Sequence, residues 1–145
     1  MEIEKKIDQV LTNLKVTKST KMKTLGEISD YIEYGDIQKE EVIKDLNLLI
    51  SFLVTQTDDG IKEEVLDIIL RGENCQGVDK EIDLSPIISN LSTFNEQSIS
   101  YILSLLGYSG KKEYKTYIEQ FKDNASLKED VEDALYELNY RMSQQ

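Results

Sequence analysis

Histidine is absent from this chain of 145 residues, and cysteine occurs once, at Cys75. Histidine is the side chain that enzymes use most often as a general base, and it is also the commonest metal ligand. Without histidine, and with a single thiol, a zinc site built from cysteine and histidine is excluded. The lone cysteine also excludes an internal disulfide, which favours a reducing compartment. We therefore expect no metal site and no bound cofactor.

Long apolar runs are also missing. The run "LNLLISFLV" stops after about nine residues, whereas a membrane-spanning helix needs about twenty. The N-terminal sequence "MEIEKKIDQV" carries acids where a secretory signal has a basic region. We expect a cytoplasmic protein that makes no contact with a membrane.

Basic residues are few relative to acidic ones. The chain has 28 aspartates and glutamates and 17 lysines and arginines, so its formal net charge is -11. This charge repels nucleic acid and attracts basic proteins. We expect a basic protein partner and no nucleic acid. A basic segment from Lys15 to Lys23 is the exception, and the sequence assigns it no role.

Proline occurs once, at Pro86, and apolar residues recur at helical spacing through almost the whole chain. The length suits one domain. We predict a single all-α domain over residues 1–145, with about eight helices that are joined by short turns and therefore antiparallel to their neighbours. The predicted N-terminal caps are Asp36, Asp58, Ser85, Asn95 and Ser126. The segment "RGENCQGVDKEID" is predicted to be a loop, because it combines two glycines with several polar residues.

The apolar positions of the last four predicted helices form two similar sets. Ile87, Ile88 and Leu91 match Tyr117, Ile118 and Phe121 at an offset of 30, and Ile99, Ile102, Leu103 and Leu106 match Val131, Ala134, Leu135 and Leu138 at an offset of 32. Matching pairs of helices indicate stacked helical hairpins. An antiparallel bundle without repeats produces the same spacing, so both architectures stay open.

The stretch "PIISNLSTFNEQSISYILSLLGYSG", followed by "KEYKTYIEQFKDNASLKEDVEDALYELNY", resembles degenerate HEAT-like repeats. The resemblance covers roughly Leu84 to Met142. A protein of this size and acidity is also similar to the small α-helical immunity proteins that accompany bacterial polymorphic toxins. The resemblance implies a stack of helical hairpins and a toxin as partner. It assigns no individual residue, because no short motif specific to that group is present.

Two stretches have some features of catalytic or metal-binding motifs. "GENCQG" has the glycine spacing of a phosphate loop, but Val78 and Asp79 replace the lysine and the hydroxyl residue that should follow. "DDGIKEE" lacks the alternating acids of a calcium loop, and we interpret Asp58 and Asp59 as the start of a helix. No pair of carboxyls is singled out for acid and base chemistry. We predict that the protein is not an enzyme.

The last predicted helix carries a stripe of acids and tyrosines opposite its apolar face. Glu129, Asp133, Tyr136 and Tyr140 recur at positions i, i+4, i+7 and i+11, and they are flanked by Glu132 and Glu137. In an array of hairpins the sixth helix would lie beside this stripe and add Glu96 and Tyr101, with Tyr108 as a further candidate. Tyrosines suit an interface, because they add contact area and a hydroxyl at low entropic cost. The alternative is that Tyr136 and Tyr140 cover a neighbouring helix.

The first half of the chain offers a second candidate acidic surface. Its members would be Glu33, Asp36, Glu40, Glu41 and Asp45.

Three functional hypotheses follow from these patterns. The first is an immunity protein that neutralises a basic toxin domain, such as a nuclease, through the acidic tyrosine-bearing surface. The second is a HEAT-like scaffold in a larger assembly, whose binding would depend little on salt. The third is an enzyme that uses carboxyls alone, which would need a pocket with two convergent carboxyls of perturbed pKa. We rank them in this order.

Overall fold

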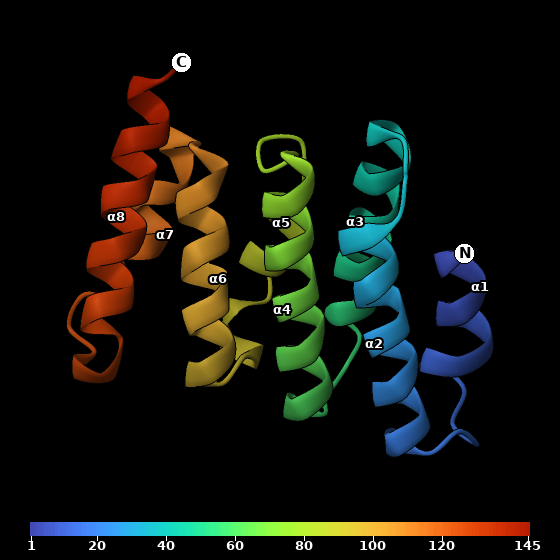
Figure 1. The fold of residues 1–145 in the computed structure, drawn as a ribbon. Coiled ribbons are helices and arrows are strands. Elements are labelled where there is room, and N and C mark those ends of the chain that lie inside the picture. The colour runs from blue at the N-terminus through green and yellow to red at the C-terminus, as the bar shows by residue number, and fades with distance from the viewer. The chain divides into compact units, whose positions relative to one another are not determined.

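The structure is a computed structural model that describes all 145 residues as eight α-helices without a strand (Figure 1). This confirms the predicted all-α class. The chain divides into two compact units, Met1–Val78 and Asp79–Gln145, each of which is described by itself. The single domain expected from the length stays a prediction.

The first unit contains four helices. They are α1 (Ile3–Lys6), which continues as a π-helical turn over Ile7–Leu11, then α2 (Lys18–Tyr34), α3 (Lys39–Leu53) and α4 (Asp59–Gln76). Helix α4 packs against both α2 and α3, and α1 packs against α3. The core of the unit is built mainly from isoleucine, leucine and valine, for example Leu25, Leu46 and Ile69, each 0% exposed.

Helices α2 and α4 run in the same direction. Near their N-terminal ends, Lys18 Nζ lies 3.1 Å from Asp58 Oδ1. Further along both helices, the Arg71 guanidinium donates to Ser29 Oγ over 3.2 Å. At the C-terminal ends, Gln76 Nε2 donates to the carbonyl oxygen of Ile32 over 2.6 Å. The contacting residues come later in both helices from one end of the pair to the other, so the two helices are parallel.

The second unit contains α5 (Ser85–Ile88), α6 (Glu96–Ser109), α7 (Lys115–Glu119) and α8 (Lys128–Ser143), with 3-10 turns at Leu91–Thr93, Lys112–Tyr114 and Ala125–Leu127. Helices α6 and α8 are side by side, and both run toward the upper edge of Figure 1. Ser100 Oγ donates to Asp130 Oδ1 over 2.9 Å near their starts, and Gln145 Nε2 donates to the carbonyl oxygen of Gly110 over 2.9 Å near their ends. The short helix α7 packs against both.

The register of α6 and α8 is close to the repeat offset found in the sequence. The two hydrogen bonds join residues 30 and 35 positions apart, which brackets the offset of 32. Second helices of successive hairpins would lie parallel in this way. The arrangement is therefore compatible with HEAT-like stacking.

Gly107 lets α6 approach α8 closely. A Cβ atom at this position would lie 2.8 Å from the carbonyl oxygen and 3.1 Å from the Cα atom of Ala134. Both are backbone atoms, which cannot move aside as the end of a flexible side chain can. The absence of a side chain at Gly107 therefore sets the distance between the two helices.

Three of the predicted caps are wrong. Helix α3 begins after Gln38 rather than Asp36. At α5, the carboxylate of Asp83 accepts hydrogen bonds from the backbone N–H and the hydroxyl of Ser85. At α8, a 3-10 turn precedes the helix, so Asn124 rather than Ser126 accepts the capping hydrogen bond. At α8 the 3-10 turn Ala125–Leu127 places the capping residue two positions earlier than predicted.

Two predicted caps are confirmed. Asp58 Oδ1 accepts from the backbone N–H of Ile61 over 2.9 Å, and Asn95 Oδ1 accepts from Ser98 over 2.9 Å. Asp58 thus has the structural role expected from "DDGIKEE". Its hydrogen bonds with Ile61 and Lys18 lower the pKa of its carboxyl.

The predicted loop from Arg71 to Asp83 is partly wrong, because α4 continues through Gln76. Gly77 then ends the helix with a φ of 66°, in the left-handed region that favours glycine. Two contacts with α2 extend the helix: the ion pair of Arg71 with Glu33, at 2.8 Å, and the hydrogen bond from Gln76. Cys75 is exposed on a helix rather than in a loop.

Candidate functional site

Helix α8 exposes the predicted stripe of acids and tyrosines. Glu129, Glu132 and Asp133 are exposed, and the residues Tyr136 and Tyr140 are 73% and 52% exposed. The opposite face is buried through Leu127, Val131, Ala134 and Leu138. The alternative that the two tyrosines cover a neighbouring helix is therefore wrong within this chain.

A shallow groove runs between α6 and α8 beside the stripe. It has a volume of about 270 Å³ and is lined by Ser104, Tyr108, Asp133, Ala134 and Glu137. The structure thus brings Tyr108 to the same surface as Asp133 and Glu137.

Tyr101 and Glu96 lie further along α6. Tyr101 is half-buried and stands three residues before Ser104, so it shares the outer side of α6 with the groove. Glu96 is exposed in the first turn of α6, two turns before Ser104. The predicted site residues therefore form one core on α8, with Tyr101 beside it and Glu96 at its far end.

Glu137 differs from the other acids of the stripe, because it has a cationic partner. Arg141 Nε donates to Glu137 Oε1 over 2.8 Å, and the guanidinium carbon lies 4.9 Å from the centre of the Tyr108 ring. Glu137 is half-buried. The hydrogen bond with Glu137 raises the pKa of Arg141, and the charge of Asp79 acts in the same direction. A partner protein would meet a neutralised carboxylate here.

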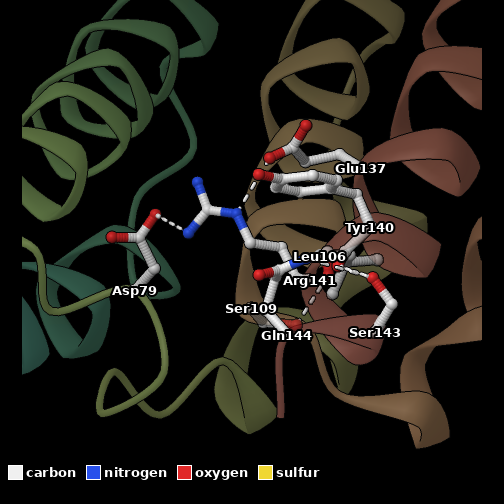
Figure 2. Close-up of polar contacts among 8 residues, drawn as sticks. All are labelled: Asp79, Leu106, Ser109, Glu137, Tyr140, Arg141, Ser143 and Gln144. Carbon is white, nitrogen blue, oxygen red and sulfur yellow. Dashed lines mark hydrogen bonds and ion pairs between the residues drawn. The ribbon is translucent and has the colours of Figure 1, made fainter.

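Figure 2 shows Arg141 between Glu137 on one side and Asp79 on the other. Asp79 follows Val78 in the turn before α5 and is buried. Arg141 Nη1 lies 3.8 Å from Asp79 Oδ2, too far for a hydrogen bond, and that oxygen has no other partner. Burial raises the pKa of Asp79, and the charge of Arg141 offsets this only in part. Glu137, Arg141 and Asp79 thus connect α8 with the turn before α5.

The second acidic surface suggested by the sequence does not form as expected. Asp45 is 2% exposed and lies in the interior of the first unit. The side chain of Glu33 is 12% exposed and is held by Arg71 at 2.8 Å, while Arg71 also contacts Asp67 at 2.8 Å. Asp36, Glu40 and Glu41 are exposed. Asp45 is covered where α3 packs beside the N-terminal segment, which a count of charges along the sequence could not show.

Sequence reasoning missed Arg141 and Asp79. The spacing of Glu137 and Arg141, at i and i+4, is a signal that could have predicted their pairing. Nothing in the sequence indicates that Asp79 reaches Arg141, because this contact depends on the path of the turn before α5.

The fold and this surface define an all-α protein with an exposed acidic and tyrosine-bearing helix face. Comparisons of the chain with protein-family models, with curated proteins and with solved structures give no match. None of the helices combines the length and apolar character needed to cross a membrane. No group of three or more side chains of histidine, cysteine, aspartate or glutamate is arranged to hold a metal ion.

Proposed function

We propose that this protein is a non-catalytic binding protein, specifically an immunity protein that binds and neutralises a cognate basic toxin domain, such as a nuclease. The observation that carries the proposal is the joint exposure of Tyr136 and Tyr140 beside Glu129 and Asp133 on α8. Large exposed aromatic side chains on a charged helix face favour a contact surface over a solvated one.

The charges of the face suit a cationic partner. Glu129, Glu132 and Asp133 have no partner among the ion pairs of the structure, in contrast to Glu137. A nuclease domain needs positive charge to hold its substrate, so a partner of net charge -11 is attracted to it over long distances. The tyrosines would then supply short-range contact area once the two surfaces meet.

A HEAT-like scaffold in a larger assembly is the second candidate. It is favoured by the parallel packing of α2 on α4 and of α6 on α8, each within its own unit, because repeat scaffolds stack equivalent helices in this way. A scaffold could bind a neutral partner, and its association would then depend little on salt.

The experiment that tests the proposal begins with the tagged protein as bait in its native cells, at low and at moderate salt. Mass spectrometry of the eluate should identify a basic polypeptide whose toxic activity is lost when this protein is added. Recovery of a multi-subunit assembly without such activity would favour the scaffold instead.

Charge reversal on α8 then tests the surface. The double substitution Glu129→Lys and Asp133→Lys should slow association with the toxin by about tenfold at low salt, and should flatten its salt dependence, because it removes the attraction that steers the encounter. Association rates would be measured by stopped-flow fluorescence or surface plasmon resonance. Both residues are exposed, so folding should be unaffected.

The matched control is Glu27→Lys with Asp30→Lys, two exposed acids of α2. This double variant changes the net charge by the same amount, so an effect of net charge alone would appear equally in both. If the two double variants associate at the same rate, the face on α8 is not the contact surface.

A further inference from the structure

An open cavity of about 470 Å³ lies in the first unit, between α3 and the N-terminal helical segment. On α3 it is lined by Glu41, Lys44, Asp45 and Leu48, which share one face at positions i, i+3, i+4 and i+7. The opposite wall consists of Glu2, Ile3, Glu4, Lys5 and Asp8. Neither the stripe on α8 nor the groove beside it belongs to this cavity.

Asp45 is the residue of the cavity that indicates ligand binding. The residue is 2% exposed, and its Oδ2 atom has no hydrogen-bond partner. A buried carboxylate without a partner costs folding free energy, so proteins usually supply a donor. Here the protein supplies none, and the carboxyl lines the cavity.

The lysines of the cavity do not neutralise Asp45. Lys5 Nζ is held by Glu2, at 2.9 Å, on the exposed rim. Lys44 precedes Asp45 in the chain, but its side chain is exposed and forms no ion pair. With five acids and two lysines in its lining, the cavity has an excess of negative charge.

The remaining lining suits a cation with an apolar stem. Ile3 is buried and Leu48 is half-buried, so both present hydrocarbon to the cavity. The acids are not arranged as a metal site. A primary ammonium group has three N–H donors and a compact charge, which matches one buried carboxylate better than a planar guanidinium would.

We propose that this cavity binds a primary alkylammonium group, which donates to Asp45 while its alkyl chain lies against Ile3 and Leu48. The same group is carried by a free aliphatic amine and by the lysine side chain of a partner protein. The proposal does not depend on the function of α8.

The surroundings of Asp45 predict how binding depends on pH. Burial raises the pKa of Asp45 to about 6, and the negative charge of Glu41 adds to this, while Lys44 and the N-terminal ammonium oppose it. From α2, Tyr31 faces the same site, and burial together with the charges of Asp45 and Glu41 raises the pKa of its hydroxyl. The carboxylate is therefore ionised at pH 7.5, and amine binding should weaken as the pH falls through 6.

The test uses the full chain at pH 7.5 with two probes, 1,5-diaminopentane and Nα-acetyl-lysine amide. Titration calorimetry gives the affinities, and NMR chemical shifts of the Ile3 and Leu48 methyl groups locate the site. We expect saturable binding by at least one probe, with Asp45→Asn weakening it at least tenfold. Asp30→Asn, which removes an exposed acid of α2 outside the cavity, should bind as the unsubstituted protein does. Circular dichroism checks that both variants are folded.

Each outcome has a defined meaning. Tighter binding of the diamine identifies a free amine as the ligand, and tighter binding of the lysine derivative identifies a partner's side chain. The proposal is overturned if neither probe saturates, if Asp45→Asn binds equally well, or if the uncharged alcohol 1-pentanol binds as tightly as the diamine.

Discussion

Asp45 and Asp79 show two outcomes for an acid that is buried in a helical protein. Asp79 has Arg141 at 3.8 Å, and the cation offsets part of the cost of burial. Asp45 has neither a hydrogen bond on Oδ2 nor an ion pair. An ionised carboxyl in this position lowers the free energy of unfolding. The presence of an acid at position 45 is therefore better explained by ligand binding than by a contribution to folding.

The substitution Asp45→Asn should stabilise the protein at neutral pH. The folded-state pKa of about 6 lies above the ordinary value of 3.8, so the native state binds the proton more tightly than the unfolded chain does. The free energy of unfolding therefore falls as the pH rises from about 4 to about 6, and by linkage Asp45→Asn removes a penalty of about 3 kcal/mol at pH 7. Urea unfolding at pH 7 and at pH 4 measures the difference, which should be close to zero at the lower pH. An equal effect at both values would contradict the argument.

Helix α8 has three sides, and each makes a different kind of contact. Its apolar face builds the core, its side toward α6 carries Asp130 and Ala134, and its outer side carries the exposed tyrosines. The close approach of α6 at Gly107 brings Tyr108 to the edge of that outer side. The contact between these two helices thus decides which side chains share a surface.

The substitution Gly107→Ala tests this contact. Alanine favours the helix over glycine by about 1 kcal/mol, but the new methyl group would collide with the backbone of Ala134 and force the helices apart. We expect a net loss of about 1–2 kcal/mol in the free energy of unfolding, measured with urea.

The control for Gly107→Ala is Gly26→Ala in α2. A Cβ atom at Gly26 meets nothing within 4 Å. Here the helix preference of alanine acts alone, and stability should rise by up to about 1 kcal/mol. A gain at both glycines would show that α6 and α8 are not in close backbone contact.

At the scale of the whole molecule, the excess of acids acts on stability as well as on binding. The chain has 28 acids and 17 basic side chains, so acids remain in excess even if every basic side chain is paired with one of them. Repulsion among them opposes the compact state and is screened by salt.

Added salt should therefore stabilise the protein. Raising sodium chloride from 20 to 200 mM shortens the Debye length from about 20 Å to about 7 Å, and we expect the thermal midpoint at pH 7 to rise by a few degrees. Scanning calorimetry measures the shift. Near pH 4.5, the isoelectric point calculated from the sequence, the same addition should have little effect. A midpoint that falls with salt at pH 7 would mean that ion pairs, such as those of Arg71, outweigh the repulsion.

Much of the architecture and part of the candidate site could be predicted from the sequence. The apolar spacing predicts the all-α class and most core residues, and the stripe of Glu129, Asp133, Tyr136 and Tyr140 follows from the geometry of a single helix. These features are local, because the period of a helix alone decides which residues share a face. The repeat offset also anticipates the register of α6 on α8, since matching apolar faces pack against each other.

The tertiary structure alone decided the features that depend on contacts between distant segments. Asp45 carries the same charge as its exposed neighbour Glu41, yet it is buried because of how α3 packs beside the N-terminal segment. Arg141 meets Asp79 because the turn before α5 passes the end of α8. The end of α4 at Gln76, where a loop was predicted, depends on its contacts with α2. In each case the arrangement is stabilised by contacts between different helices and turns. The apolar period of a single helix carries no information about these contacts.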